Sequence, residues 1–403
     1  MEQWEDATPG ERVRRVRKRA RITQTEFADR LGKSQGWVSQ VEHDLLPLDR
    51  FSLVADVAKA LNVHPNEITA QPFRGGSETS ERAHACIPAV RRQVMRYDLP
   101  PEDLIPRPLD ALLADVRHAG ELRKQARYAH LAELMPGLLA ELHAATETLT
   151  GHNREEACRL RAMLFREATS LTNALGYPDL AAMTIECSRR AASSGNDPLW
   201  NAVVDYQHAR GFWLSAAWDD ALALLDAALS QLENDLKDDR PEVLALWGGL
   251  NLRAAVTAAR KLDADGAYAR IGVADEAARR LGQRERHDYY KIDFNSANVA
   301  LHRVGVAAEL GDGAEAVQAG EGLALPSDMP AERRGHYLLD LSRGWLWLGN
   351  RERSLARMRQ AERVAPQMMR HHAIGRETVR HLVEQHRRLP EELRRLADRM
   401  QVS

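Results

Sequence analysis

The sequence predicts an all-α protein with a small N-terminal helical domain and a larger body of repeated helix pairs. Apolar residues recur at helical spacing, and the stretch from Leu109 to the end shows no β-branched alternation typical of strands. Similar turn sequences also recur in the second half of the chain. Because 403 residues are too many for one small helical domain, we expect two domains.

The first predicted helix runs from about Pro9 to Ala20. Proline stands at an early helical position, where it is tolerated, and Val13, Val16 and Ala20 make an apolar stripe. We expect this stripe to pack on the two helices that follow.

Residues 23–43 predict two short helices joined by a tight turn. Three residues of the first helix lie at helical spacing on its apolar side: Phe27, Ala28 and Leu31. Gly32 tolerates a positive φ in the turn, and Ser34 can cap the second helix. In that second helix we expect Val38 and Val41 to be buried.

Two further helices complete the predicted N-terminal domain, which we place at residues 1–72. Asp49 is expected to cap the fourth helix, whose inward residues include Val54 and Leu61. A short fifth helix is expected over Asn66 to Ile68.

The stretch from about Glu11 to Ile68 resembles the lambda-repressor-like (XRE) helix-turn-helix family. The motifs that carry the resemblance are T-Q-x-x-F-A from Thr23, L-G at Leu31, and S-Q-x-x-V-S-x-V-E from Ser34 to Glu42. The resemblance implies a five-helix DNA-binding domain whose second helix of the pair enters the major groove.

In that family pattern, Gln24 would hydrogen-bond a phosphate, while Gln35, Ser39 and Gln40 would face base edges. The remaining predicted DNA contacts are Arg15, Thr25, Lys33, Ser34 and Trp37. Two residues depart from the pattern. Gly36 removes one possible base contact, and Trp37 is bulky enough to pack on the sugar-phosphate backbone or on the neighbouring helix.

Basic residues gather around the predicted helix pair. Residues 12–40 hold nine basic side chains against two acidic ones, Glu26 and Asp29. Basic residues that neutralise phosphates make DNA affinity fall steeply with salt, so this excess predicts a phosphate footprint, although the outermost arginines also suit a solvated helix face. The partner is expected to be double-stranded DNA with a palindromic operator, bound by a homodimer.

Residues 73–82 are rich in Gly, Ser and charge and predict a flexible linker, which leaves residues 83–403 as the body. A helix around Ala85 to Tyr97 is followed by a proline-rich connection.

Five turn signatures recur in the body. Each is followed by a small residue that opens the next helix: Ala181, Ala221, Ala267, Ala316 and Ser354. The pattern resembles tetratricopeptide (TPR) helix pairs, so we expect a TPR-like α-solenoid whose first helices line an inner face.

The TPR pattern places polar, cationic and aromatic side chains on that inner face. The candidate ligand-binding residues are Arg166, Asn173, Tyr206, Arg210, Trp213, Asn298 and Arg343, with Ser170, Arg260, Glu309 and Trp347 beside them. Amide and guanidinium groups suit an extended peptide or a polar small molecule. The aromatic members also suit the core between helices.

Several classes of site are not expected. The three cysteines are far apart and form no C-x-x-C, which argues against zinc and disulfides and favours a reducing cytoplasm. We find no run long enough to span a membrane, no metal or cofactor motif, and no catalytic grouping. The arginine-rich, alanine-rich composition suggests a bacterial source.

The sequence therefore predicts a transcriptional regulator that binds DNA as a dimer and whose body senses a peptide or small molecule. The alternative is a DNA-tethered scaffold whose body docks a partner protein. An enzyme hidden in the body is the least favoured interpretation.

Overall fold

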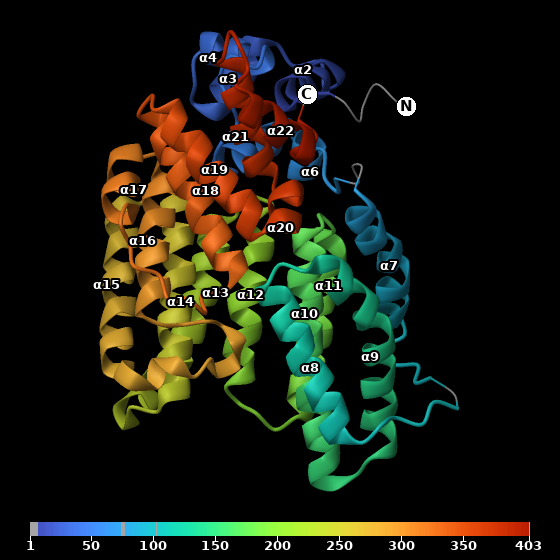
Figure 1. Cartoon of the computed structure of the whole chain (residues 1–403). Helices are drawn as coiled ribbons and strands as arrows, with labels where there is room; N and C mark the ends of the chain where they lie inside the picture. Colours follow the sequence, from blue (N-terminus) through green and yellow to red (C-terminus); the bar gives the residue numbers. More distant parts are fainter. Residues whose placement is uncertain (1–6, 74–76, 102, 403) are drawn as a thin grey trace.

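A computed structural model of the chain describes residues 7–73, 77–101 and 103–402. All regular structure in these residues is helical, which confirms the predicted all-α class. We call residues 7–73 the head and residues 77–402 the body. The head lies at one end of the body, against the ends of the body helices (Figure 1). Residues 1–6 and 74–76, parts of the predicted domain and linker, lie outside the described residues, as does Ser403.

The head has the five predicted helices. They are α2 (Pro9–Arg19), α3 (Gln24–Leu31), α4 (Gln35–Glu42), α5 (Phe51–Leu61) and α6 (Pro65–Thr69). Local sequence fixes their ends. Thr8 and Thr23 each form a capping box with a glutamate three residues on, and Ser34 accepts a hydrogen bond from the backbone N–H of Trp37. Gly32 adopts φ 62° in the turn between α3 and α4, as expected.

The expected capping role of Asp49 is wrong. Arg50 is the N-cap residue of α5, and no side chain caps this helix. The Asp49 carboxylate instead accepts a hydrogen bond of 2.5 Å from Nε1 of Trp347, in the body. A contact from outside the head has replaced the local one.

The helix after the head starts earlier than predicted. Helix α7 spans Glu78–Met95, because the Ser77 hydroxyl accepts from the backbone N–H of Ser80 at 3.2 Å and caps the helix there. Residues 78–82 are therefore helical and not part of a flexible linker. The division of the chain into two domains at this point stays a prediction.

The body is a row of six antiparallel helix pairs. The pairs are α8 (Leu109–Lys124) with α9 (Tyr128–Thr148), α10 (Gly151–Ala174) with α11 (Pro178–Ser194), α12 (Trp200–Trp213) with α13 (Trp218–Leu232), α14 (Pro241–Arg260) with α15 (Ala264–Leu281), α16 (Ser296–Leu310) with α17 (Gly313–Gly320), and α18 (Ala331–Trp347) with α19 (Arg351–Val364). All five predicted turns join the two helices of a pair. The small residues that follow those turns are all buried.

One turn geometry joins the two helices of every pair. Each turn contains one residue with positive φ: Ala126, Gly176, Ala216, Leu262, Gly311 or Gly349. In the fifth pair, for example, the backbone N–H of Gly311 donates to Ala308 and that of Asp312 donates to Ala307. These two bonds close the C-terminus of the first helix. The first pair, whose turn has Ala126 at the left-handed position, was not among the five predicted turns.

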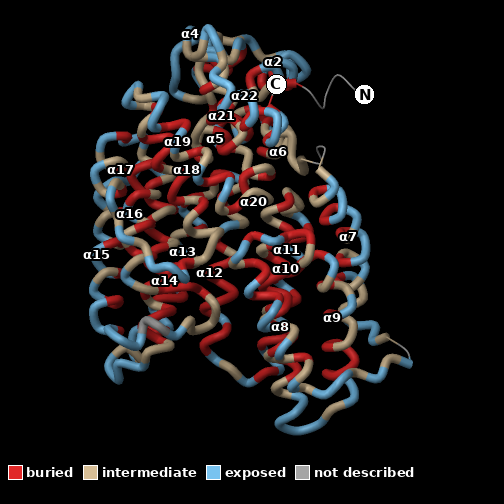
Figure 2. Tube along the Cα trace, viewed as in Figure 1, coloured by how far each residue is buried: buried red, intermediate tan, exposed pale blue. Residues whose placement is uncertain are grey.

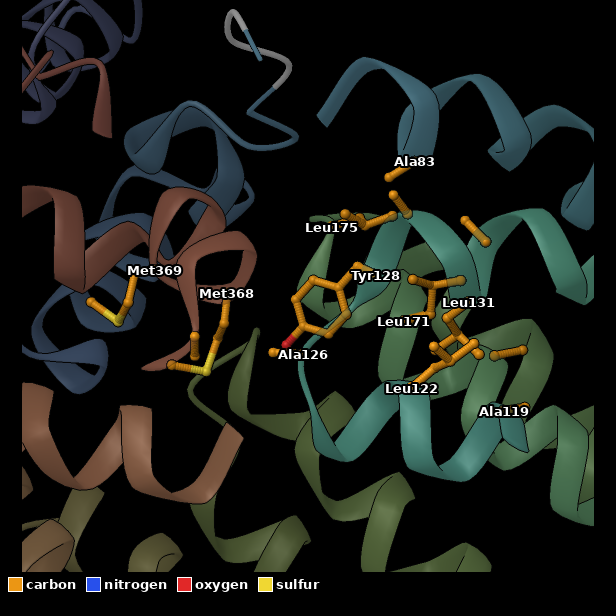
Figure 3. Packing of buried hydrophobic residues seen from close by; sticks show 14 of the residues in the cluster. Ala83, Ala119, Leu122, Ala126, Tyr128, Leu131, Leu171, Leu175, Met368 and Met369 are labelled. Carbon is orange, nitrogen blue, oxygen red and sulfur yellow. The ribbon is translucent and has the colours of Figure 1, made fainter. Parts of the chain in front are cut away.

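The row of pairs closes on itself. Arg123 of α8 forms an ion pair of 2.8 Å with Glu332 of α18, and the backbone N–H of Ala129 in α9 donates to Gln367 in α20 (Pro366–His371). One apolar cluster contains residues from both ends of the row, including Tyr128 and Met368, which Figure 3 shows on facing elements. The first and last pairs of the row therefore meet, and most buried residues lie within the helix bundle while the exposed ones lie on its outside (Figure 2).

Two C-terminal helices return to the head. Helices α21 (Ala373–Glu384) and α22 (Glu391–Met400) lie beside it in Figure 1, and Ile374 of α21 joins the apolar core of the head. Short 3₁₀ segments at Glu233–Asp238, Gly282–Arg286 and Tyr289–Lys291 fill connections between pairs.

Candidate functional site

The predicted base-reading residues lie on the outer side of the head. Helix α4 lies at the end of the head that points away from the row of helix pairs in Figure 1, with α3 next to it. Of the predicted DNA contacts, the exposed ones are Arg15, Thr25, Lys33, Ser34, Gln35 and Gln40, whereas Gln24, Trp37 and Ser39 are half-buried. The structure thus brings these side chains to one outer region, and their contact with DNA stays a prediction.

A buried ion pair holds α4 in place against α2. Arg17 donates from Nε and Nη2 to the two carboxylate oxygens of Glu42, at 2.5 and 2.9 Å. Gln24 Nε2 also donates to Glu42, at 2.8 Å, and Gln24 Oε1 accepts from Gln35 Nε2 at 2.6 Å. The chain of contacts therefore runs from a buried arginine to Gln35, the first residue of α4, and orients its side chain.

The ion pair also sets the ionisation of its members. Burial raises the pKa of the Glu42 carboxyl, but the hydrogen bonds from Arg17 and Gln24 outweigh burial, and the net pKa lies below 4.5. The hydrogen bond to Glu42 raises the pKa of Arg17. Both groups stay charged over the ordinary pH range.

Two of the nine basic residues in the predicted phosphate footprint are structural. Arg17 pairs with Glu42, and Arg12 is buried, with its Nε donating to the carbonyl of Ala7 at 2.9 Å. Including these two in the footprint was wrong, because their guanidinium groups are held inside the head. The seven exposed basic residues are Arg14, Arg15, Lys18, Arg19, Arg21, Arg30 and Lys33.

Trp37 packs against the head core and is half-buried. The Lys33 ammonium lies 6.0 Å from the centre of its ring. The indole thus has a protein partner already, in line with the expectation that it packs on a neighbouring element.

A cavity of about 370 Å³ lies inside the body under the head. Its lining includes all seven candidate ligand-binding residues: Arg166, Asn173, Tyr206, Arg210, Trp213, Asn298 and Arg343. Ser170, Arg260 and Glu309 line it as well. Trp347 is absent from the lining because its indole binds Asp49 of the head. The structure brings these residues together, and ligand binding by them stays a prediction.

The head supplies part of the cavity wall, which the sequence analysis did not anticipate. The lining residues from the head are Phe51, Val54, Pro65, Asn66, Thr69 and Gln71. No local pattern marks them, because their role depends on how the head docks on the body.

The docked head rests on the turns of the helix pairs. Asn66 Nδ2 donates to the carbonyl of Gly176 at 3.1 Å, and Arg50 Nη1 donates to that of Leu310 at 3.5 Å. Lys59 reaches the carbonyl of Ala216 at 3.5 Å. The head thus contacts three of the six turns. A change in the spacing of the pairs would therefore shift the contacts that hold α5 and α6.

Ionisable groups in the cavity are strongly affected by their surroundings. Burial alone would raise the pKa of Tyr206, but Arg253 and Arg333 lower it to about 7. Burial and nearby arginines lower the pKa of His302 and His336 to about 3, so both are neutral at pH 7. Such perturbed groups in a cleft are typical of functional sites.

The described residues contain no cluster of three or more His, Cys, Asp or Glu side chains that could hold a metal ion. None of the described helices combines the length and the apolar character needed to cross a bilayer.

The fold is that of a helix-turn-helix head joined to a body of stacked helix pairs. Residues 10–71 match the family described as "Helix-turn-helix domain". Among solved structures, the chain is similar to Bacillus thuringiensis PlcR in complex with the peptide PapR7 and DNA. The identity is 16%, over 72% of this chain and 99% of that one, with a TM-score of 0.30. The curated proteins include no match to this sequence.

Proposed function

We propose that this chain is a sequence-specific transcriptional regulator whose body binds a signal, a small molecule or a peptide, in the cavity under the head. The observation that supports this most directly is the mixed wall of that cavity. Helices α5 and α6 of the head line it together with the inner helices of the body. A ligand there would touch the DNA-binding domain directly.

A ligand in the cavity would control DNA binding if it had a higher affinity for one docked position of the head than for another. A ligand shifts such an equilibrium only by its difference in affinity for the two states. Asn66 and Gln71 both line the cavity and donate to body carbonyls, so a ligand that competes for them changes how firmly the head is docked.

The regulator is proposed to bind DNA as a homodimer. One α4 contacts only a few base pairs, and two copies at half-sites roughly 34 Å apart give useful specificity. The alternative of a partner-docking scaffold is less favoured, because the ends of the row meet and residues of the head form part of the wall of the inner face.

The test is selection of bound sequences from a pool of random duplexes by the full chain. We expect enrichment of a palindromic motif with half-sites about one helical turn apart. Enrichment of a single half-site would contradict the dimer, and no enrichment would contradict sequence-specific binding. For the signal, ligands that raise the thermal stability of the full chain are then added to the DNA-binding assay, and unchanged affinity would contradict control.

A further inference from the structure

The chemistry of the cavity indicates which ligands it takes. Seven arginines and three carboxylates line it: Arg123, Arg166, Arg210, Arg253, Arg260, Arg333, Arg343, Glu309, Glu332 and Asp340. Four of the arginines are neutralised by ion pairs. Their carboxylate partners are Glu167, Asp293 and Glu332 for Arg123, Glu167 for Arg166, Glu309 for Arg260, and Asp340 for Arg343.

Three arginines remain without a carboxylate partner among the described residues: Arg210, Arg253 and Arg333. Arg253 lies over the ring of Tyr206, with its guanidinium carbon 4.0 Å from the ring centre. Arg333 donates to the carbonyl of Ile292 at 3.4 Å. The Nε atoms of Arg253 and Arg333 are buried and have no hydrogen-bond partner in the described parts of the chain. Each such donor is costly to bury unpaired.

Arg210 is the most exposed of these cations. It makes no hydrogen bond and no ion pair with any residue that the structure describes. Its side chain is exposed although α12 runs along the inner side of the body, because it borders the cavity. The surface of Arg210 faces the cavity and not bulk water, so desolvation by the surrounding protein and repulsion from Arg253 and Arg260 lower its pKa to about 10, and it is still a cation at pH 7.

An anion bound in the cavity would reduce the repulsion among Arg210, Arg253 and Arg333. Three like charges near one another oppose folding of the empty protein, and ionisation of Tyr206, which Arg253 and Arg333 favour, offsets this repulsion only in part. A guanidinium group matches the geometry of a carboxylate or a phosphate. The carboxylate of Glu332 attracts Arg210, but it already pairs with Arg123 at 2.8 Å.

The rest of the wall suits an apolar group. Trp213 is covered by the guanidinium of Arg260 at 3.9 Å and lines the cavity with Phe51, Tyr128 and Leu301. Figure 3 shows the ring of Tyr128 with its hydroxyl turned away from Leu131 and Leu171. Aromatic walls with a few fixed polar groups are typical of small-molecule sites.

We propose that the cavity binds a small organic oxyanion, a carboxylate or phosphate on an aromatic or aliphatic body, whose charged group is held by Arg210 together with Arg253 and Arg333. This rests on the proposed function, of which it names the ligand class. The apolar part of the ligand lies along Trp213 and Phe51, and therefore against α5 of the head.

The test measures thermal unfolding of the full chain with matched probes. The anionic probes are phenylpropionate, phenyl phosphate and a panel of larger aromatic and aliphatic acids, and each has a neutral amide or alcohol as its counterpart. A short peptide with a free C-terminus and its amidated form tell a peptide carboxylate from a free acid. We expect members of the anionic set to raise the Tm by roughly 5 °C near saturation and the neutral set to leave it unchanged.

Arg210→Met separates ligand binding from stability. It keeps the length of the side chain and removes its charge, so we expect the shift with anions to vanish while the ligand-free Tm stays equal or rises. The matched control is Arg279→Met, an exposed arginine on α15, which should keep the full shift.

Four outcomes would overturn the proposal, three of them in the ligand-induced shifts. They are equal shifts with neutral probes, a full shift in Arg210→Met, or no shift with any anion of the panel. A lower ligand-free Tm in Arg210→Met would assign this residue a structural role and also overturn it. Regulation is read separately: an anion that binds through Arg210 without changing DNA affinity would support the ligand class and contradict the proposed control of DNA binding.

Discussion

Trp347 and Asp49, 298 residues apart, are joined by a hydrogen bond of 2.5 Å from the indole Nε1 to the carboxylate. Trp347 ends the first helix of the last pair, and Asp49 precedes α5 in the head. The bond therefore ties the end of the row of pairs to the DNA-binding domain. Because hydrogen bonds to charged groups contribute about 1.5–3 kcal/mol, this contact helps to hold the docked head.

Trp347→Phe should loosen the head without unfolding the body. The variant keeps an aromatic ring and loses the N–H, so we expect faster amide exchange in α5 and α6. Trp345→Phe is the matched control, because Trp345 Nε1 donates to Glu321 at 2.5 Å entirely within the body. Equal exchange in the head of both variants would show that the Asp49 contact does not hold it.

The sequence predicted what depends on local patterns. Gly32, Ser34 and the small residues after five turns mark helix ends and close packing, and the structure has them where expected. Asp49 looked like a cap by the same logic. Its role was missed because a residue almost 300 positions away decides it, and no local rule contains that information.

In the candidate site, too, the sequence predicted the features that local patterns determine and missed those that depend on distant parts of the chain. Placing helices on the TPR pattern brought Arg166, Tyr206 and Arg210 to one face because the spacing of a helix pair determines which side points inward. The closure of the row by Arg123 and Glu332, and the head residues in the wall, depend on how six pairs accumulate curvature. Small differences between pairs set that curvature, and the sequence pattern does not resolve them.

Replacing Gln35 and Gln40 together by alanine should remove sequence preference while leaving nonspecific binding at low salt largely intact. A good bidentate contact between an amide and a base is worth about 1–3 kcal/mol of discrimination. The measurement is affinity for the selected motif against a scrambled duplex. Gln231→Ala, an exposed glutamine of α13, is the control. A parallel loss of specific and nonspecific binding would contradict the assignment of these side chains.

Arg15→Ala should weaken binding to all duplexes and flatten the dependence of affinity on salt. A phosphate contact contributes about one unit to the slope of log affinity against log salt concentration. Titrations at several salt concentrations measure this slope. Arg279→Ala removes an exposed arginine from the body and should leave it unchanged. An unaltered slope in Arg15→Ala would mean that α2 faces away from the DNA.

Glu42→Gln should destabilise the head strongly, because it leaves the buried Arg17 without a counter-charge. Breaking a buried ion pair from one side costs about 3–5 kcal/mol. Since the pKa of Glu42 is lowered in the folded state, its contribution in the wild type is present above pH 4.5 and is lost as the pH falls through the folded value.

Thermal unfolding across the acid range tests this prediction. Glu67→Gln is the control, because the Arg19–Glu67 pair is exposed and such pairs contribute about 0–1 kcal/mol. If both variants lost the same small stability, the ion pair under α4 would not be what holds that helix.

Tyr206 should titrate near neutral pH. Burial opposes ionisation of its hydroxyl, but Arg253 and Arg333 outweigh burial and lower the pKa to about 7 from 10. A lowered acid pKa stabilises the fold above it, so the stability of the wild type relative to Tyr206→Phe should grow from pH 7 to 10 and be lost as the pH falls through 7. Tyrosinate absorbance should show one group titrating near pH 7, absent in Tyr206→Phe and present in Tyr337→Phe, whose tyrosine has a raised pKa. A tyrosine that ionises only near pH 10 would show that the arginines around the cavity are already neutralised.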